Sequence, residues 1–215
     1  TEVRDKVLYW TSLGKKVVLV GGDHSTPLGY YEALATIHDD FGILHLDAHM
    51  DLRIAYEGFT YSHASIMYNA LQIPEISRIV QVGIRDFCEQ EVSFIHDSNG
   101  RVLVNTDSEL KAETFMGKSW SEQCDAIIAT LPKKVCVSFD VDGMNSSYCP
   151  NTGTPVPGGF SFEQATYLFN KLAESDKEII GFDLVEVAPG ETDDWDGNVG
   201  ARMLFHMCGM LAKNN

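Results

Sequence analysis

Short apolar runs recur along the chain, and polar or glycine-rich segments separate each run from the next. Their lengths and their β-branched side chains are typical of buried strands. Six strands are predicted in this way, namely Lys16–Val20, Phe41–Leu46, Ile79–Val82, Val102–Val104, Lys133–Phe139 and Ile179–Leu184.

Segments in which apolar residues recur at helical spacing lie between most of these strands. The predicted helices cover residues 1–15, Pro27–Ile37, Ala64–Leu71, Phe87–Ile95, Ser119–Leu131, Ser161–Leu172 and Val199–Leu211. Strands that alternate with helices favour an α/β fold in which helices cover both faces of a parallel sheet. In such a sheet, ligands bind beyond the carboxyl ends of the strands.

Acidic and imidazole side chains follow three of the predicted strands directly. Gly21-Gly22-Asp23-His24-Ser25 follows the first strand, Asp47-Ala48-His49-Met50-Asp51 follows the second, and Ser138-Phe139-Asp140-Val141-Asp142 closes the fifth. Alternate side chains of an extended backbone share a face, so each motif presents its polar groups together. The candidate metal ligands are His24, Asp47, His49, Asp51, Asp140 and Asp142.

Each motif by itself has a plain structural explanation. An Asp-x-Asp sequence after a strand is usually a turn or a helix cap, and Gly-Gly-Asp-His is usually a tight turn with a polar tip. These structural explanations do not account for all three motifs together. Carboxylates at neighbouring strand ends repel one another and are hard to desolvate unless a cation compensates their charge. The set therefore predicts a binuclear metal centre.

Composition narrows the classes of partner. The 215 residues are 44% hydrophobic and carry a formal net charge of −15, which suits one globular domain and argues against nucleic acid and anionic membranes as partners. No run is apolar for long enough to span a membrane. The five cysteines form no Cys-x-x-Cys pair, so reduced thiols in a cytoplasmic protein are the simplest interpretation.

With these motifs in view, the sequence resembles the ureohydrolase family, which contains arginase, agmatinase, guanidinobutyrase and formimidoylglutamase. The loop Thr152–Gly159 and the run Asp183-Leu184-Val185-Glu186-Val187-Ala188-Pro189 complete the family pattern in the right order. The resemblance implies a three-layer α/β/α arginase-like fold. It also implies that residues 1–215 form one ureohydrolase domain without the strand and helix that usually precede the first motif in the family.

The resemblance further implies two Mn²⁺ ions per chain. His24, Asp47, Asp51 and Asp140 correspond to the ligands of one ion. Asp47, His49, Asp140 and Asp142 correspond to those of the other, with Asp47 and Asp140 bridging. Ligands rich in oxygen, with one imidazole for each ion, suit manganese better than a metal that prefers thiolates.

The chemistry implied is hydrolysis of a guanidinium group to urea and an amine by hydroxide generated at the metal pair. Asp51 would accept the proton of the attacking water, and Glu186 would pair with the guanidinium. His63 lies at a spacing similar to that of the family's proton-shuttling histidine, although a surface histidine at a helix start is the alternative. His45 differs from the usual apolar or aromatic residue, and we expect it to be a buried, hydrogen-bonded side chain.

The substrate is the least determined part of the prediction. Ser62-His63-Ala64-Ser65 is similar to the agmatinase pattern, whereas Asp51-Leu52-Arg53 resembles formimidoylglutamases. An agmatinase-like enzyme is favoured. If Arg53 faces the pocket, a guanidino acid becomes more attractive than agmatine, because a buried arginine repels an amine.

Other classes stay open at this stage. Formimidoylglutamase and arginase are the alternatives within the family, and a catalytically silent metal-binding member is the alternative outside enzymes. A deacetylase-like relative with a single zinc is a further one. The family suggests a homo-oligomer, either a trimer or a hexamer.

Overall fold

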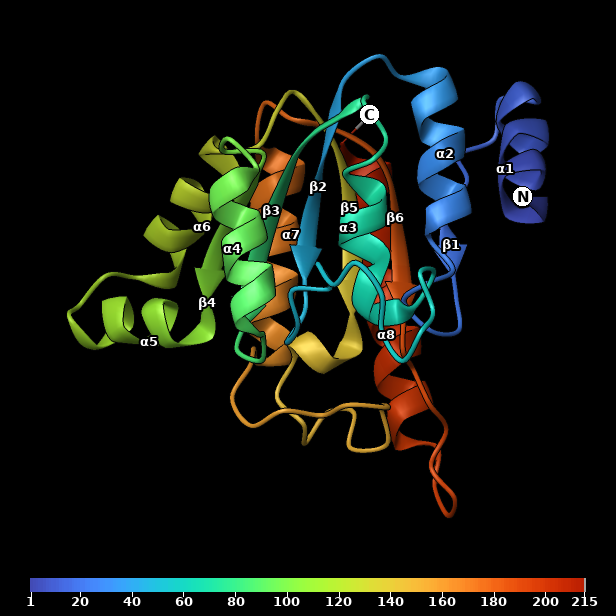
Figure 1. Cartoon of the computed structure of the whole chain (residues 1–215). Coiled ribbons are helices and arrows are strands. Elements are labelled where there is room, and N and C mark those ends of the chain that lie inside the picture. The colour runs from blue at the N-terminus through green and yellow to red at the C-terminus, as the bar shows by residue number, and fades with distance from the viewer. Residues whose placement is uncertain (215) are drawn as a thin grey trace.

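The computed structural model describes residues 1–214 and contains one parallel sheet of six strands, in the order β1-β6-β5-β2-β3-β4 (Figure 1). The strands are β1 (Leu19–Val20), β2 (Phe41–Leu46), β3 (Ile76–Ile84), β4 (Val102–Thr106), β5 (Lys134–Asp140) and β6 (Glu178–Val185). The α-helices are α1 (Glu2–Ser12), α2 (Leu28–Ile37), α3 (Ile66–Ala70), α4 (Glu89–Asp97), α5 (Asp107–Phe115), α6 (Trp120–Ala129), α7 (Phe162–Glu174) and α8 (Trp195–Lys213). The predicted α/β class with a parallel sheet is confirmed.

Two apolar clusters lie on opposite faces of this sheet. Leu44 and Leu46 of β2 face α6, α7 and α8, whereas Ile43 of the same strand faces α2 and α3. Every residue of β2 is buried, as expected for a strand with helices on both sides. Figure 1 shows these helices in front of and behind the sheet, with α1 outside α2. The fold therefore has the expected three layers.

Two differences from the prediction go beyond shifted or extended element ends. The first strand is only Leu19–Val20. Its pairing with β6 begins at Leu19, which pairs with Asp183, so residues Lys16–Val18 lie before the paired segment. The helix α5 was not predicted. Its N-terminus is a capping box in which Thr106 and Glu109 exchange side-chain and backbone hydrogen bonds. The Thr-x-x-Glu pattern was therefore the available sequence evidence for this helix.

The order of the strands creates a switch point between β2 and β5. From β2 the chain winds outward to β3 and β4, and from β5 it winds the other way to β6. Because ligands bind at such points, the loops that follow β2 and β5 are the expected site. Among the described residues, no helix combines the length and apolar character that crossing a membrane requires.

Candidate metal centre

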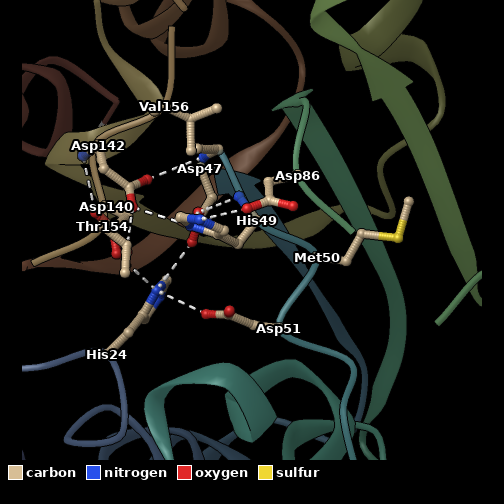
Figure 2. A network of polar contacts seen from close by, with 12 residues as sticks. His24, Asp47, His49, Met50, Asp51, Asp86, Asp140, Asp142, Thr154 and Val156 are labelled. Atoms are coloured by element: carbon tan, nitrogen blue, oxygen red, sulfur yellow. Dashed lines mark hydrogen bonds and ion pairs between the residues drawn. The ribbon is translucent and has the colours of Figure 1, made fainter. Parts of the chain in front are cut away.

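Four of the predicted ligands meet around one ring nitrogen at the carboxyl ends of the strands (Figure 2). Nδ1 of His24 lies 3.0 Å from Oδ2 of Asp47, 3.2 Å from Oδ2 of Asp51 and 3.1 Å from Oδ2 of Asp140. All four side chains are buried. Three carboxylates around one nitrogen form a compact pocket of ligand atoms.

A second group shares Asp47 with the first. Nδ1 of His49 lies 3.0 Å from Oδ2 of Asp142 and 3.4 Å from Oδ1 of Asp47. Ligand atoms of Asp47, His49 and Asp142 are close enough together to hold one ion, and those of His24, His45, Asp47 and Asp51 to hold another. The structure thus brings all six predicted ligands together and adds His45 to their surroundings.

A buried network fixes the ring of His24 from behind. Oγ of Ser138 lies 2.9 Å from Nε2 of His24 and donates to Oδ1 of Asp183 at 2.8 Å. The hydroxyl of Tyr31 donates to the other oxygen of Asp183 at 2.8 Å. Since Ser138 uses its proton on Asp183, it accepts from Nε2–H of His24. Nδ1 of His24 therefore faces the three carboxylates, where it has no aligned hydrogen bond. Burial disfavours the charged imidazole, but the contacts with Asp140, Asp47 and Asp51 outweigh that effect and raise the pKa of His24 well above its usual range, so Nδ1 carries a proton in the metal-free protein.

Burial and mutual repulsion shift the pKa values of this cluster. Burial, together with the charge of Asp47, raises the pKa of Asp51 to about 7. Burial disfavours the charged form of His49, but its contacts with Asp142 and Asp47 outweigh that effect and raise its pKa to about 11. Burial and the neighbouring Asp142 raise the pKa of Asp140 well above its usual range. Protons thus supply the compensating positive charge when no metal does.

These shifts predict how the stability of the metal-free protein depends on pH. Between pH 3.8 and about pH 7, Asp51 keeps its proton in the folded chain but loses it in the unfolded chain. The same holds for His49 between pH 6.5 and about pH 11. Because the folded state binds more protons, the free energy of unfolding falls as pH rises. Calorimetry in EDTA should show the melting temperature falling from about pH 5 to about pH 9. A His49→Asn control should fall less steeply above about pH 7, and a rising melting temperature in the parent protein would contradict the sign.

The loop between β2 and α3 forms one wall of a pocket beside the ligands. The cavity has a volume of about 110 Å³ and is lined by His49, Asp51, Arg53, Tyr56, His63, Ala64, Asp86, Glu91 and Thr154. His63 packs edge-on against Tyr56, with ring centroids 5.5 Å apart. Ser62 caps the short 3₁₀ turn that begins at His63. His63 therefore lines the candidate site and is not a remote surface histidine.

Arg53 also lines this pocket, and an acidic partner lies near it. Its Nε is 3.9 Å from Oε2 of Glu91, whose side chain is buried and accepts from the backbone N–H groups of Leu52 and Cys88. The guanidinium also lies over the ring of Tyr56, at 5.2 Å from its centroid. The positive charge of Arg53 is thus compensated within the pocket wall.

Glu186 and Asp51 have backbone conformations that favour glycine. Their φ angles are 63° and 54°, and non-glycine residues in this region concentrate at functional sites. Oε1 of Glu186 accepts from the backbone N–H of His24 at 2.8 Å, and its carbonyl accepts from the hydroxyl of Thr152 at 2.9 Å. Glu186 therefore lies between the first motif and the glycine-rich loop.

Two residues at the end of β3 belong to the site but were not predicted. Asp86 lies 3.7 Å from Nε2 of His49, on the side away from Asp142. Arg85 donates to the carbonyl oxygens of Gly83, Asp142, Gly143, Met144 and Val156. It thereby joins three backbone segments around the centre. Their position directly after a strand was the sequence evidence that could have identified both.

Comparison with known proteins relates the chain to a family of hydrolases. A sequence model described as the arginase family matches residues 1–209. The chain is 32% identical over 208 residues to an N(1)-aminopropylagmatine ureohydrolase of Thermus thermophilus, covering 97% of this chain and 67% of that protein. It is 31% identical to agmatinase of Halalkalibacterium halodurans, covering 81% of this chain and 56% of that one.

Solved structures agree with the sequence relatives. Agmatine ureohydrolase of Thermoplasma volcanium superposes with a TM-score of 0.83 at 27% identity, over 99% of this chain and 68% of that one. Arginase from Bacillus caldovelox, at 23% identity, shares the fold with a TM-score of 0.80 over 98% of this chain and 73% of that one. The chain covers about three fifths to two thirds of the length of the four relatives described as N(1)-aminopropylagmatine ureohydrolases.

Proposed function

The chain belongs to the arginase family, and from this premise we propose that it is a metal-dependent hydrolase that cleaves a guanidino compound to urea and an amine. The observation that carries the proposal is the convergence of four carboxylates and two imidazoles at the switch point of the sheet. Repulsion among these carboxylates makes such a cluster unfavourable for a purely structural role. The 215 residues would form one such domain.

We propose two Mn²⁺ ions as the cofactor, because the donor set fits them. Four carboxylates balance the charge of two divalent ions, and oxygen ligands with one imidazole for each ion suit manganese. The position of Nδ1 of His24 among three carboxylates supports one site, because a metal ion could replace its proton there, and the contact between His49 and Asp142 supports the other. Asp47 and Asp140 would bridge the ions. The absence of cysteine from the described ligand cluster disfavours the closed tetrahedral set of a structural zinc site.

The protein's own residues would divide the catalytic work. When bound, the metal pair supplies hydroxide at neutral pH by lowering the pKa of water. Asp51 would accept the proton of the attacking water, and its burial at the junction of the ligand cluster and the pocket supports that role. His63, on the outer wall, would pass a proton to the departing amine. Glu186 would orient the guanidinium through a charge-assisted hydrogen bond.

The pocket favours a substrate that carries an amine rather than a carboxylate. Glu91 compensates Arg53, so the repulsion that would exclude an amine is weakened. A second hollow adjoins the first, and the two share Tyr56 and His63. Its lining is acidic and aromatic, a combination that attracts ammonium groups, and consists of Asp23, Tyr56, Glu57, Phe59, Tyr61, Ser62 and His63. Agmatine and N(1)-aminopropylagmatine are therefore the substrates we propose, in line with the names of the relatives.

A panel of guanidino compounds tests this proposal. Protein loaded with Mn²⁺ is assayed for urea release from agmatine, N(1)-aminopropylagmatine, arginine, 4-guanidinobutyrate and guanidine, with protein in EDTA as the control. Formimidoylglutamate is assayed in parallel by formamide release. We expect kcat/KM to be highest for the two amines. Preference for an acid would reverse the substrate assignment, and no turnover of any compound would favour the silent family member.

Assembly and location complete the proposal. We propose a homo-oligomer, trimeric or hexameric, that acts in the cytoplasm on a small-molecule substrate. The compartment is supported by the five cysteines, all of which are free thiols. The net charge of −15 disfavours nucleic acid and anionic membranes as partners.

A further inference from the structure

A row of polar side chains crosses the centre of the sheet beneath the ligand cluster. Gln81 of β3, His45 of β2, Ser138 of β5 and Asp183 of β6 are successive register partners on neighbouring strands, so they lie side by side on one face. All four are fully buried. Ser138 and Asp183 fix the ring of His24 as described above, which leaves the other half of the row without an assigned role.

The contacts of Gln81 determine which way its amide points. Nε2 of Gln81 lies 2.6 Å from the carbonyl oxygen of Met50 and 3.0 Å from Nδ1 of His45. A carbonyl oxygen can only accept, so the group that faces Met50 must be the NH₂ group. The second hydrogen of that group is then directed at Nδ1 of His45. Nδ1 therefore accepts a hydrogen bond and carries no proton.

Because Nδ1 of His45 carries no proton, the proton of the neutral ring must be on Nε2. A neutral imidazole with an accepting Nδ1 carries its proton on Nε2. Nε2 of His45 lies 2.8 Å from Oδ2 of Asp47, so it donates to that oxygen. The backbone N–H of His49 donates to Oδ1 of the same carboxylate at 2.6 Å. Each oxygen of Asp47 thus receives one N–H and keeps one further acceptor site.

We propose that His45, held in this tautomer by Gln81, is a positioning residue that fixes Asp47 as the bridging ligand. The proposal rests on the proposed function and deepens it. One remaining acceptor site on each oxygen gives Asp47 one lone pair for each of the two ions. His45 belongs by distance to the group that could hold a metal, but its Nε2 presents a proton to Asp47 and not a lone pair to a cation.

Three variants test the assignment by Mn²⁺ binding to metal-free protein, followed by electron paramagnetic resonance of the unbound ion. His45→Phe keeps an aromatic ring but removes the donor, and Gln81→Leu removes the group that fixes the tautomer. Both are expected to weaken Mn²⁺ affinity by roughly 10- to 100-fold, the range for residues that orient metal ligands, with two ions still bound at saturation. His45→Gln can supply an N–H near the position of Nε2 and should restore most of the affinity.

A matched control separates positioning from general destabilisation. Val80 precedes Gln81 on β3 and packs in the cluster on the opposite face of the sheet. Val80→Ala should lower the melting temperature without changing Mn²⁺ affinity. Unchanged affinity in both His45→Phe and Gln81→Leu would overturn the proposal, and loss of one whole ion from His45→Phe would make His45 a ligand instead. A parent protein that binds no Mn²⁺ would refute the proposed function itself.

Discussion

Replacing Asp140 by asparagine is expected to abolish Mn²⁺ loading and hydrolysis of the guanidino substrate together. Oδ2 of Asp140 lies 3.1 Å from Nδ1 of His24, and its Oδ1 accepts from the backbone N–H of Asp142 at 2.9 Å. If Asp140 bridges both ions, as proposed, its replacement removes a ligand from each of them. We expect Mn²⁺ affinity to fall by more than the roughly 10- to 100-fold seen when only an orienting residue is removed, and turnover to fall below detection.

The same substitution should not destabilise the metal-free fold. Burial and the charge of Asp142 raise the pKa of Asp140, which means that the charged carboxylate is unfavourable where it stands. A neutral amide of the same shape needs no bound proton to avoid that cost, so the melting temperature in EDTA should stay level or rise. Asp125→Asn on the exposed face of α6 is the matched control and should keep both metal and activity. Two bound Mn²⁺ ions and normal turnover in the Asp140 variant would refute the bridging role.

Replacing His63 by alanine is expected to leave Mn²⁺ binding intact and to lower kcat by roughly 10²- to 10⁴-fold, the usual contribution of general acid–base catalysis. His63 lines the pocket with Asp51 but lies outside both groups of ligand atoms. The loss should therefore concern proton transfer to the leaving amine. Urea release and metal content are measured on the same preparation.

Two comparisons make the His63 result interpretable. His96, in the last turn of α4, is a histidine outside the site, and His96→Ala should leave kcat unchanged. A leaving group with a lower pKa needs less protonation, so an activated guanidino substrate should be hydrolysed by the His63 variant with a smaller defect. Equal rates for the His63 variant and the parent protein would remove His63 from the mechanism.

The ligand cluster could be predicted because it depends on local order along the chain. Phe41–Leu46 was predicted to be a strand and is one, so Asp47, His49 and Asp51 follow directly at its carboxyl end. Parallel strands then bring this motif next to the one after β5, whatever the exact register. The loop Thr152–Gly159 was recognised in the sequence as part of the family pattern.

The layer beneath the cluster could not be predicted in the same way. His45 and Gln81 are 36 residues apart, and Ser138 and Asp183 are 45 residues apart. Their contacts require a specific pairing register, and a shift of one residue would move each side chain to the other face. No local pattern specifies that register. The sequence therefore indicates the ligands but not the residues that orient them.

The helix α5 marks a different limit. Its apolar spacing is weak, since only Asp107 and Leu110 are buried along it, so periodicity did not identify it. The capping box at Thr106 determines where it begins, and Asp107 is placed near Gly158 of the glycine-rich loop. Local hydrogen bonding, rather than hydrophobic pattern, defines this helix.

The most direct test of the whole account is the amount and arrangement of manganese in the parent protein. Metal-free protein is titrated with Mn²⁺, the bound ions are counted by elemental analysis, and electron paramagnetic resonance records whether they interact. The account predicts two ions per chain with the spectrum of a spin-coupled pair. One isolated ion, or none at saturating Mn²⁺, would contradict it.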